Sequence, residues 1–252
     1  MDTLSEPRYK MRSSFRGGAE ARRHAVHAWR KFFKYAVAAG HCSKNPASAI
    51  RLPRKSSSRR RGLTREEVEK LFDLISTTGN DPELDVLIFR TALETGCRRG
   101  GLLGLTKDRV DEKRQTVTVL EKGGRERELP VSRSLVDALL QHNHQRGGSK
   151  GALLRYLDST PLTQRRLDYL FARVKEAPPF PGAELVSMHW LRHTAGTFIE
   201  RASGSSEAIA ANYLGHEPTR SSVTGLYTTA PLMEMVRVWC SVWNCDHPLA
   251  HE

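Results

Sequence analysis

Residues 189–194 read His-Trp-Leu-Arg-His-Thr, and this short stretch holds two basic groups at helical spacing. Arg192 lies three residues after His189, so both side chains face the same side if the stretch begins a helix. A His-x-x-Arg pair by itself is more typical of an ordinary protein surface. The pair therefore indicates a functional site only together with the other basic and nucleophilic residues of the chain.

Two segments downstream add a second imidazole and a phenol. The first is Leu214-Gly215-His216, and Tyr227 follows eleven positions later within Gly225-Leu226-Tyr227-Thr228. A tyrosine oxygen can attack phosphorus, but with an ordinary pKa of about 10 it needs neighbouring cations or a base. Tyr213 is the other tyrosine near these motifs, and its place in a predicted helix favours a buried, packing role.

Upstream, Arg98 follows Thr95-Gly96-Cys97 at the end of a helix predicted for residues 82–94. Proline at the first turn and Gly96 just past the end mark the limits of that helix. A guanidinium suits phosphate binding because its planar fork bonds two oxygens and stays charged. Arg99 is the competing candidate, but the spacing from Gly96 favours Arg98.

A β-hairpin is predicted between these arginines. Valines and threonines alternate over residues 116–119, Gly123-Gly124 forms a two-residue turn, and residues 125–131 return as the partner strand. Lys122 stands at the mouth of this hairpin. A lysine beside a Gly-Gly turn has no function by default.

Together these segments resemble the tyrosine recombinases, the phage integrase family. The box at 189–194 matches the family's His-x-Leu-Arg-His-Thr nearly letter for letter, and it is the most specific motif in the chain. Thr-Gly-x-Arg at 95–98, the hairpin at 119–130 and Leu-Gly-His at 214–216 match as well. The resemblance runs from about Ala25 to the region of Trp243 and is strongest between Gly96 and Tyr227.

The resemblance implies a role for each residue of the set. Tyr227 is the nucleophile, Lys122 is the general acid for the departing 5′ oxygen, and His189 handles protons beside the tyrosine. His216 donates a hydrogen bond to the scissile phosphate, and His193 is expected to have a structural role. The implied catalytic residues are Arg98, Lys122, His189, Arg192, His216 and Tyr227.

The implied activity is site-specific DNA recombination through a 3′-phosphotyrosine intermediate and a Holliday junction. Positive groups aimed at the transition-state oxygens supply the catalysis, so neither a cofactor nor a metal is expected. Four protomers are expected to act on two DNA sites, each with a specific core sequence. Two alternatives stay open: a type IB topoisomerase-like enzyme, and a DNA-binding relative with impaired catalysis.

Two departures from the family pattern stand out. The family usually carries an acidic residue three positions after the first arginine, and this chain has Gly101 there. At the front, only about the last half of the family's four-helix core-binding domain is recognisable, ending in Asn45-Pro46-Ala47. Either the DNA clamp is reduced or the sequence is a truncated form.

We expect a mainly α fold with a small antiparallel β-hairpin or sheet. Residues 1–50 are assigned to a shortened helical DNA-clamp region, residues 51–62 to a basic Arg/Ser linker, and residues 63–252 to the catalytic domain with a C-terminal helix. The linker has almost nothing to bury, so we interpret it as a strap along DNA phosphates. The DNA-binding candidates are Arg54, Lys55, Arg59, Arg60, Arg125 and Arg127.

The composition agrees with a polyanionic partner. The 252 residues include 40 Lys and Arg against 28 Asp and Glu, giving a formal charge of +12, which favours double-stranded DNA. Four cysteines show no CxxC pairing and are expected to be free thiols. No apolar run approaches the roughly 20 residues of a membrane span, so a soluble protein of the bacterial cytoplasm or nucleoid is expected.

Two apolar stripes lie near the ends of the chain. One belongs to a helix predicted for residues 20–39 and comprises Ala25, Trp29, Phe32, Phe33, Ala36 and Val37. The other runs from Leu232 to Trp243 after the predicted nucleophile. That second stripe fits either ordinary core or a helix exchanged with a neighbouring protomer.

Overall fold

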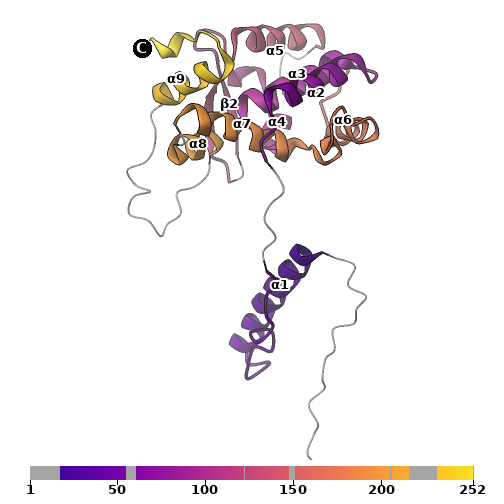
Figure 1. Ribbon diagram of the computed structural model, residues 1–252, viewed down its shortest axis with the longest axis vertical. Helices are drawn as coiled ribbons and strands as arrows, with labels where there is room; N and C mark the ends of the chain where they lie inside the picture. The colour runs from indigo at the N-terminus through magenta and orange to yellow at the C-terminus, as the bar shows by residue number, and fades with distance from the viewer. Residues whose placement is uncertain are drawn as a thin grey trace, which may run out of the picture. The chain divides into compact units, whose positions relative to one another are not determined.

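The computed structural model describes residues 18–54, 61–121, 123–147, 151–204, 206–215 and 232–251. The chain divides into two compact units, one up to Arg59 and the other from Arg60 onward (Figure 1). Six of the predicted site residues lie outside the described residues: Lys122, His216, Tyr227, Lys55, Arg59 and Arg60.

The described part of the first unit holds one long helix, α1 (Ala19–Ala38), as the apolar periodicity predicts. The segment that follows folds back along it. Arg30 donates to the carbonyls of Ala47 at 3.1 Å and Ile50 at 2.8 Å, and Asn45 donates to the Arg30 carbonyl at 3.0 Å. These bonds satisfy backbone groups of a loop that has few neighbours of its own.

The apolar stripe of α1 is only partly buried. Only Val26 and Ala36 are buried in this helix, whereas Phe32 is 62% exposed and Tyr35 is 72% exposed. Trp29 and Phe32 of the stripe are exposed, because the described part of this unit offers no side chain that covers them.

The second unit opens with two helices whose ends follow from the sequence. At the start of α2 (Arg65–Thr77), Thr64 and Glu67 form a capping box. The next helix, α3 (Pro82–Thr95), has proline in its first turn and ends at Gly96, whose φ of 55° is left-handed. The short α4 (Arg99–Leu103) follows immediately, so Arg98 lies between two helices.

The predicted hairpin is the centre of a three-stranded antiparallel sheet in the order β1-β2-β3. Its strands are β1 (Val110–Asp111), β2 (Thr116–Leu120) and β3 (Glu126–Pro130), and Leu120 pairs with Glu126 beside the turn. The two predicted strands of the hairpin are confirmed, but the turn is longer than Gly123-Gly124, because the Glu121 N–H donates to the Arg125 carbonyl at 2.8 Å. The two-residue β1 was not predicted, because so short a strand leaves no periodicity to detect.

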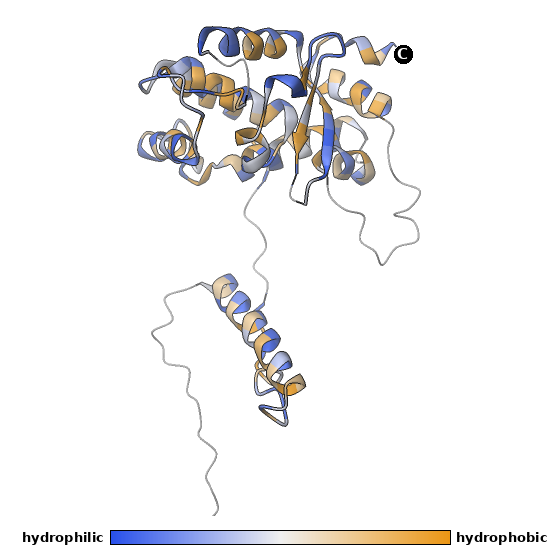
Figure 2. Ribbon diagram, turned by 180° about the vertical axis from the view of Figure 1, so that it is seen from behind, coloured by the Kyte–Doolittle hydropathy of each residue, from blue (hydrophilic) through white to orange (hydrophobic). Residues whose placement is uncertain are grey.

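Helices make up most of the rest of this unit. They pack their apolar faces around one core that includes Leu71, Leu102, Leu135 and Trp239. Figure 1 shows α3 among α2, α5 and α7, and Figure 2 shows that helices of this unit carry both hydrophobic and hydrophilic residues. The remaining elements are η1 (Lys107–Arg109), α5 (Arg133–Gln145), α6 (Gln164–Glu176), η2 (Ala183–Leu185), α7 (Met188–Ala202), α8 (Glu207–Leu214), α9 (Leu232–Trp243) and η4 (Pro248–Ala250).

The second apolar stripe belongs to the core of its own chain. Met235, Val236, Trp239 and Val242 of α9 are buried, and the Trp239 indole donates to the Glu94 carbonyl at 3.0 Å. This packing fits the ordinary-core interpretation of the stripe. Exchange of the helix with a neighbouring protomer concerns the assembly and stays a prediction.

The fold class is confirmed as mainly helical with a small antiparallel sheet. Across the described ranges, no helix combines the length and the apolar character that a membrane crossing requires.

Candidate active site

The site begins where α3 ends. Gly96 is needed there for two reasons: its backbone is left-handed, and a Cβ at this position would lie 3.0 Å from the Tyr213 ring and 3.1 Å from Leu214. This close approach brings the end of α3 against the end of α8. Arg98 follows two residues later as the N-cap residue of α4, with a side chain that is 43% exposed.

Arg192 joins these two helix ends from α7. Its guanidinium is buried and donates to the carbonyl of Gly96 at 2.5 Å and to the carbonyl of Leu214. Carbonyls at a helix C-terminus lack intrahelical donors and attract cations. Arg192 therefore fixes the segments that continue into Arg98 on one side and His216 on the other.

Arg127 of β3 makes a second bridge between the same helix ends. Its guanidinium donates to the carbonyl of Tyr213 and, at 3.4 Å, to the carbonyl of Thr95. Only 8% of the residue is exposed. Arg127 thus points inward, where a DNA backbone has no access, in contrast to the phosphate contact expected from the sequence.

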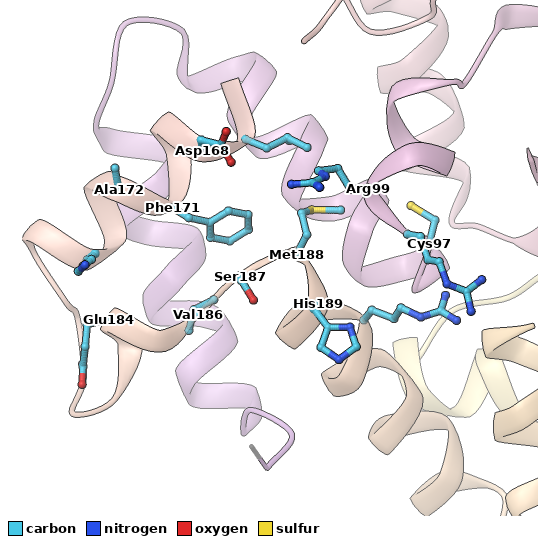
Figure 3. Close-up of a pocket in the computed structure, with 14 residues that line it drawn as sticks. Cys97, Arg99, Asp168, Phe171, Ala172, Glu184, Val186, Ser187, Met188 and His189 are labelled. Atoms are coloured by element: carbon cyan, nitrogen blue, oxygen red, sulfur yellow. The ribbon is translucent and has the colours of Figure 1, made fainter. Parts of the chain in front are cut away.

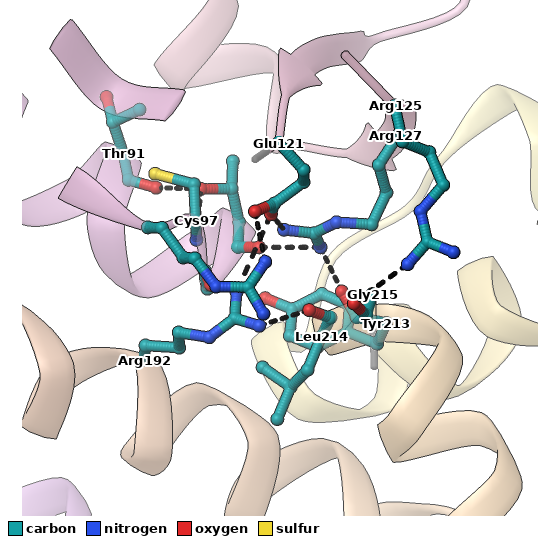
Figure 4. Close-up of polar contacts among 12 residues, drawn as sticks. Thr91, Cys97, Glu121, Arg125, Arg127, Arg192, Tyr213, Leu214 and Gly215 are labelled. Atoms are coloured by element: carbon teal, nitrogen blue, oxygen red, sulfur yellow. Dashed lines mark hydrogen bonds and ion pairs between the residues drawn. The ribbon is translucent and has the colours of Figure 1, made fainter. Parts of the chain in front are cut away.

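One carboxylate lies among these arginines (Figure 4). Glu121 accepts hydrogen bonds from Arg98 and, at 2.7 Å, from Arg127, and its Oε1 lies 3.8 Å from Nη1 of Arg192. We refer to Arg98, Arg127, Arg192 and Glu121 as the site cluster. Three positive groups share one negative group there, so the cluster keeps a surplus of positive charge.

The pKa values of the cluster reflect this arrangement. Burial, with repulsion from Arg127 and Arg98, lowers the pKa of Arg192 to about 10, so it stays charged at neutral pH. Burial raises the pKa of Glu121, but hydrogen bonds from Arg127 and Arg98 outweigh burial and leave the pKa below its usual value. The carboxylate is therefore ionised at neutral pH.

A cavity of about 600 Å³ opens beside the cluster. Arg98, His189 and Arg192 all line it, so the structure brings together three of the predicted catalytic residues. In Figure 3, His189 at the start of α7 lies on one side and Phe171 of α6 on the other. A concave, cationic wall of this kind can hold a phosphate group.

His189 owes its place to the start of α7. Ser187 caps the helix by accepting from the Trp190 backbone N–H at 3.4 Å, which puts His189 in the first turn. His189 is exposed and Arg192 is buried, yet both face the cavity, as their three-residue spacing predicts. His193 points elsewhere and pairs with the Thr197 hydroxyl at 3.2 Å.

The end of α8 carries the approach to His216. Gly215 is left-handed with a φ of 61°, and a Cβ there would lie 3.0 Å from Nε of Arg127. This explains the glycine of the Leu-Gly-His motif. Arg125 is exposed and donates to the Gly215 carbonyl at 3.1 Å.

Tyr213 has the buried position that its helix predicted. It is fully buried, its hydroxyl donates to the Glu94 carbonyl at 2.7 Å, and burial raises its pKa above the usual value. Both its position and its pKa make it unsuitable as a nucleophile at neutral pH.

The other predictions for this site concern DNA contacts and metals. Arg54 is exposed at the end of the described part of the first unit. Among the residues described in the structure, no group of three or more His, Cys, Asp and Glu side chains is placed to hold a metal ion. All four cysteines are free thiols, as predicted.

Glu121 is the contact that the sequence did not reveal. It stands next to Lys122 in a hairpin that also contains Glu126 and Glu128, and only the folded topology distinguishes it from them. One feature of the sequence pointed toward such a residue. Because position 101 is a glycine, a carboxylate that pairs with the two predicted catalytic arginines has to come from another segment.

Comparison with known proteins agrees with this geometry. The model of the phage integrase family matches residues 61–231, which is more than half of the chain. The chain therefore belongs to the phage integrase family, and its class is that of the tyrosine recombinases.

Its relatives include tyrosine recombinases XerC from two bacteria. The protein of Thermodesulfovibrio yellowstonii is 28% identical over 230 residues, covering 88% of this chain and 74% of the relative. That of Pseudomonas aeruginosa is 26% identical over 226 residues, covering 88% and 71%.

Solved structures share the fold. Lambda integrase as a dimer bound to a core site has a TM-score of 0.61 at 21% identity, covering 79% of this chain and 72% of that one. The Tn1549 transposon integrase in complex with circular intermediate DNA has a TM-score of 0.64 at 19% identity, covering 87% and 78%. A lambda integrase tetramer bound to a Holliday junction gives 0.61 at 22% identity, covering 82% and 61%.

Proposed function

We propose that this protein is a site-specific DNA recombinase that cuts and rejoins DNA through a phosphotyrosine at Tyr227. The observation that carries the proposal is the convergence of Arg98, His189 and Arg192 on one cavity, with the ends of α3 and α8 held together behind them. That wall matches the needs of a phosphodiester whose equatorial oxygens gain negative charge during displacement.

In the proposed cleavage step, the Tyr227 oxygen bonds to phosphorus and loses its proton, and the bond from phosphorus to the 5′ oxygen breaks. Lys122 protonates that oxygen, which leaves as a 5′ hydroxyl. His189 handles protons near Tyr227, and His216 donates to a phosphate oxygen. The number of phosphate ester bonds is unchanged, so resealing by a new 5′ hydroxyl needs no ATP.

We further propose that Arg98 and Arg192 have different duties. Arg98 is partly exposed and lines the cavity wall, where it can meet a phosphate. Arg192 is buried, and its bonds to the Gly96 and Leu214 carbonyls make it as much an organiser of the site as a ligand. A charged group in a low-dielectric setting acts on a phosphate more strongly than one in water.

The partner of this site is double-stranded DNA with a specific core sequence, and the working assembly is a tetramer on two such sites. Lambda integrase supports this part, since it is known as a tetramer bound to a Holliday junction. Arg54 and Arg125 are exposed and remain candidates for backbone contacts, together with Lys55, Arg59 and Arg60. The first unit acts as the DNA clamp, and the bacterial cytoplasm is the proposed location.

The test uses nicked DNA duplexes with a randomised core, because the target sequence is not needed in advance. A nick close to the cleavage point traps the covalent intermediate, since the short 5′ fragment diffuses away. Wild-type protein should form an adduct that survives denaturation, and Tyr227→Phe should form none. Tyr169→Phe, a matched change of a 45% exposed tyrosine on α6, should keep the adduct.

Two outcomes would contradict the proposal. An adduct that persists in Tyr227→Phe would place the nucleophile elsewhere. Relaxation of any supercoiled plasmid without joining of two matched sites would instead identify a topoisomerase-like enzyme.

A further inference from the structure

Glu121 has an unusual setting for a surface-hairpin residue. Its side chain is 2% exposed, and its carboxylate contacts Arg98 through one oxygen and Arg127 through the other, at 2.7 Å. Arg192 lies 3.8 Å from the same Oε1. The one carboxylate of the site cluster thus lies within ion-pair distance of all three guanidinium groups.

Glu121 is also fixed through its backbone. Its N–H donates to the Arg125 carbonyl at 2.8 Å, and its carbonyl accepts from the Gly124 N–H at 3.2 Å. These two bonds close the turn that contains Lys122. Glu121 therefore links the hairpin turn to the arginines: its backbone bonds close the turn, and its carboxylate contacts the guanidinium groups.

The neighbouring helix α4 supplies no carboxylate to these arginines. Gly101 of α4 lies against the end of β2, and a Cβ there would be 3.5 Å from the Leu120 carbonyl and 3.6 Å from Val119 Cβ. The carboxylate reaches the arginines from the hairpin side, while α4 presents no side chain at this point.

We propose that Glu121 is a positioning residue for catalysis, which holds Arg98 and Arg192 in place and supplies from the hairpin the carboxylate that α4 lacks at Gly101. The inference rests on the proposed function, since the arginines are those of the cleavage site. Without the carboxylate, three guanidinium groups repel one another. Arg98 then leaves the cavity wall most readily, because it is the most exposed of the three.

A second interpretation makes the opposite prediction. If Glu121 merely occupied the place of a phosphate on Arg98, its removal would free Arg98, strengthen DNA binding and speed cleavage. Geometry favours positioning, because Glu121 also bonds the buried Arg127, which a DNA phosphate does not reach.

The test replaces Glu121 by Gln, which keeps the shape of the side chain and removes its charge. We expect the cleavage rate constant to fall about 10- to 100-fold, the range for groups that orient a reactive ligand. DNA affinity, measured in a Tyr227→Phe background at constant salt, should stay the same or rise slightly. Glu128→Gln is the matched control: Glu128 lies on the same hairpin, pairs with Arg114 at 3.1 Å and should leave cleavage unchanged.

Two further variants separate charge from shape. Glu121→Asp keeps the charge and should cleave faster than Glu121→Gln. Gly101→Glu in the Glu121→Gln background should recover at least about tenfold of the lost rate, since it returns a carboxylate to the third position of α4, where acidic residues also suit a helix N-terminus. The recovery also guards against misfolding of the single variant.

The outcomes are distinct. Cleavage by Glu121→Gln at or above the wild-type rate, a parallel loss of affinity and rate, or no recovery by either carboxylate variant would overturn the role of Glu121. Absence of any adduct with the wild-type protein would instead overturn the proposed function itself.

Discussion

Two groups of arginines in the second unit differ in how their charge is balanced. In the site cluster, three guanidinium groups share Glu121, and backbone carbonyls accept much of their hydrogen bonding. In the second group, which we call the support cluster, Arg146, Arg166 and Arg173 contact the carboxylates of Asp81 and Asp85. A third carboxylate, that of Glu83, lies 3.9 Å from Arg146.

The support cluster is closed to solvent. Its arginines are 5–12% exposed at the side chain, and Asp85 is fully buried. Arg146 bonds both oxygens of Asp81, at 2.5 and 2.9 Å, and Arg166 bonds Asp85 at 2.7 Å. In the site cluster, by contrast, Arg98 is 43% exposed and lines a cavity. The comparison teaches that a buried, paired arginine by itself indicates a role in stabilising the fold. A group of arginines with excess positive charge at a cavity indicates a binding site for an anion.

The largest expected effect is on the cleavage rate, and it comes from replacing one arginine of each cluster by lysine. Arg192→Lys should lower the cleavage rate about 100- to 1000-fold, because an ammonium group cannot replace the forked donor at a site of developing charge. Arg166→Lys should lower stability, but the folded fraction should cleave at the wild-type rate. Single-turnover cleavage, corrected for folded protein by circular dichroism, compares them. Equal loss of activity in both variants would remove the distinction.

The next effect belongs to the support cluster. Asp85→Asn leaves Arg166 and Arg173 with one carboxylate fewer in a buried setting, which should cost about 3–5 kcal/mol of unfolding free energy. Urea unfolding of the two proteins gives this difference. A loss below about 1 kcal/mol would show that this cluster is not a structural support.

A pH effect is expected beside the support cluster. Burial, with a smaller contribution from Arg146, lowers the pKa of His142 to about 4, and its ring accepts from the Arg155 N–H at 3.1 Å. Between pH 6.5 and 4 the unfolded chain binds a proton that the folded chain does not, so the unfolding free energy falls as pH falls through this window. The contribution of His142 should be about 2–3 kcal/mol by pH 4.

His142→Gln keeps an acceptor for Arg155 and does not titrate. Its unfolding free energy should therefore depend less on pH between 6.5 and 4 than that of the wild-type protein. Identical slopes in urea unfolding over this range would show that His142 is not buried in its neutral form.

The smallest effect tests the surplus charge of the site cluster. Inorganic phosphate at about five times its Kd should raise the unfolding free energy of the wild-type protein by about 1 kcal/mol. Arg98→Gln should gain measurably less under the same conditions, while Arg173→Gln should keep the gain. An equal gain in all three proteins would indicate a general salt effect rather than binding at the site cluster.

The sequence predicted the local features that depend on neighbouring residues. The end of α3 at Gly96, the strands of the hairpin around residues 123–124 and the helix over residues 232–243 all agree with the sequence patterns. Each of these features depends on interactions between residues that are close together in the sequence. The resemblance also selected Arg98, His189 and Arg192, which the structure brings to one cavity.

The sequence did not reveal which charges point inward. Arg125 precedes β3 and Arg127 lies within it, and only the close approach of the end of α8 decides that Arg127 is buried. The same topology selects Glu121 over the other acids of the hairpin. The exposed aromatic side chains of α1 give a similar lesson, because a helical period does not say what will cover it.

The central claim is that the oxygen of Tyr227 forms the bond to DNA at the site cluster. The most direct measurement digests the trapped wild-type adduct with trypsin and nuclease and locates the attached nucleotide by mass spectrometry. The account predicts one modified peptide, which carries the nucleotide phosphate on Tyr227. A nucleotide on any other residue would contradict it.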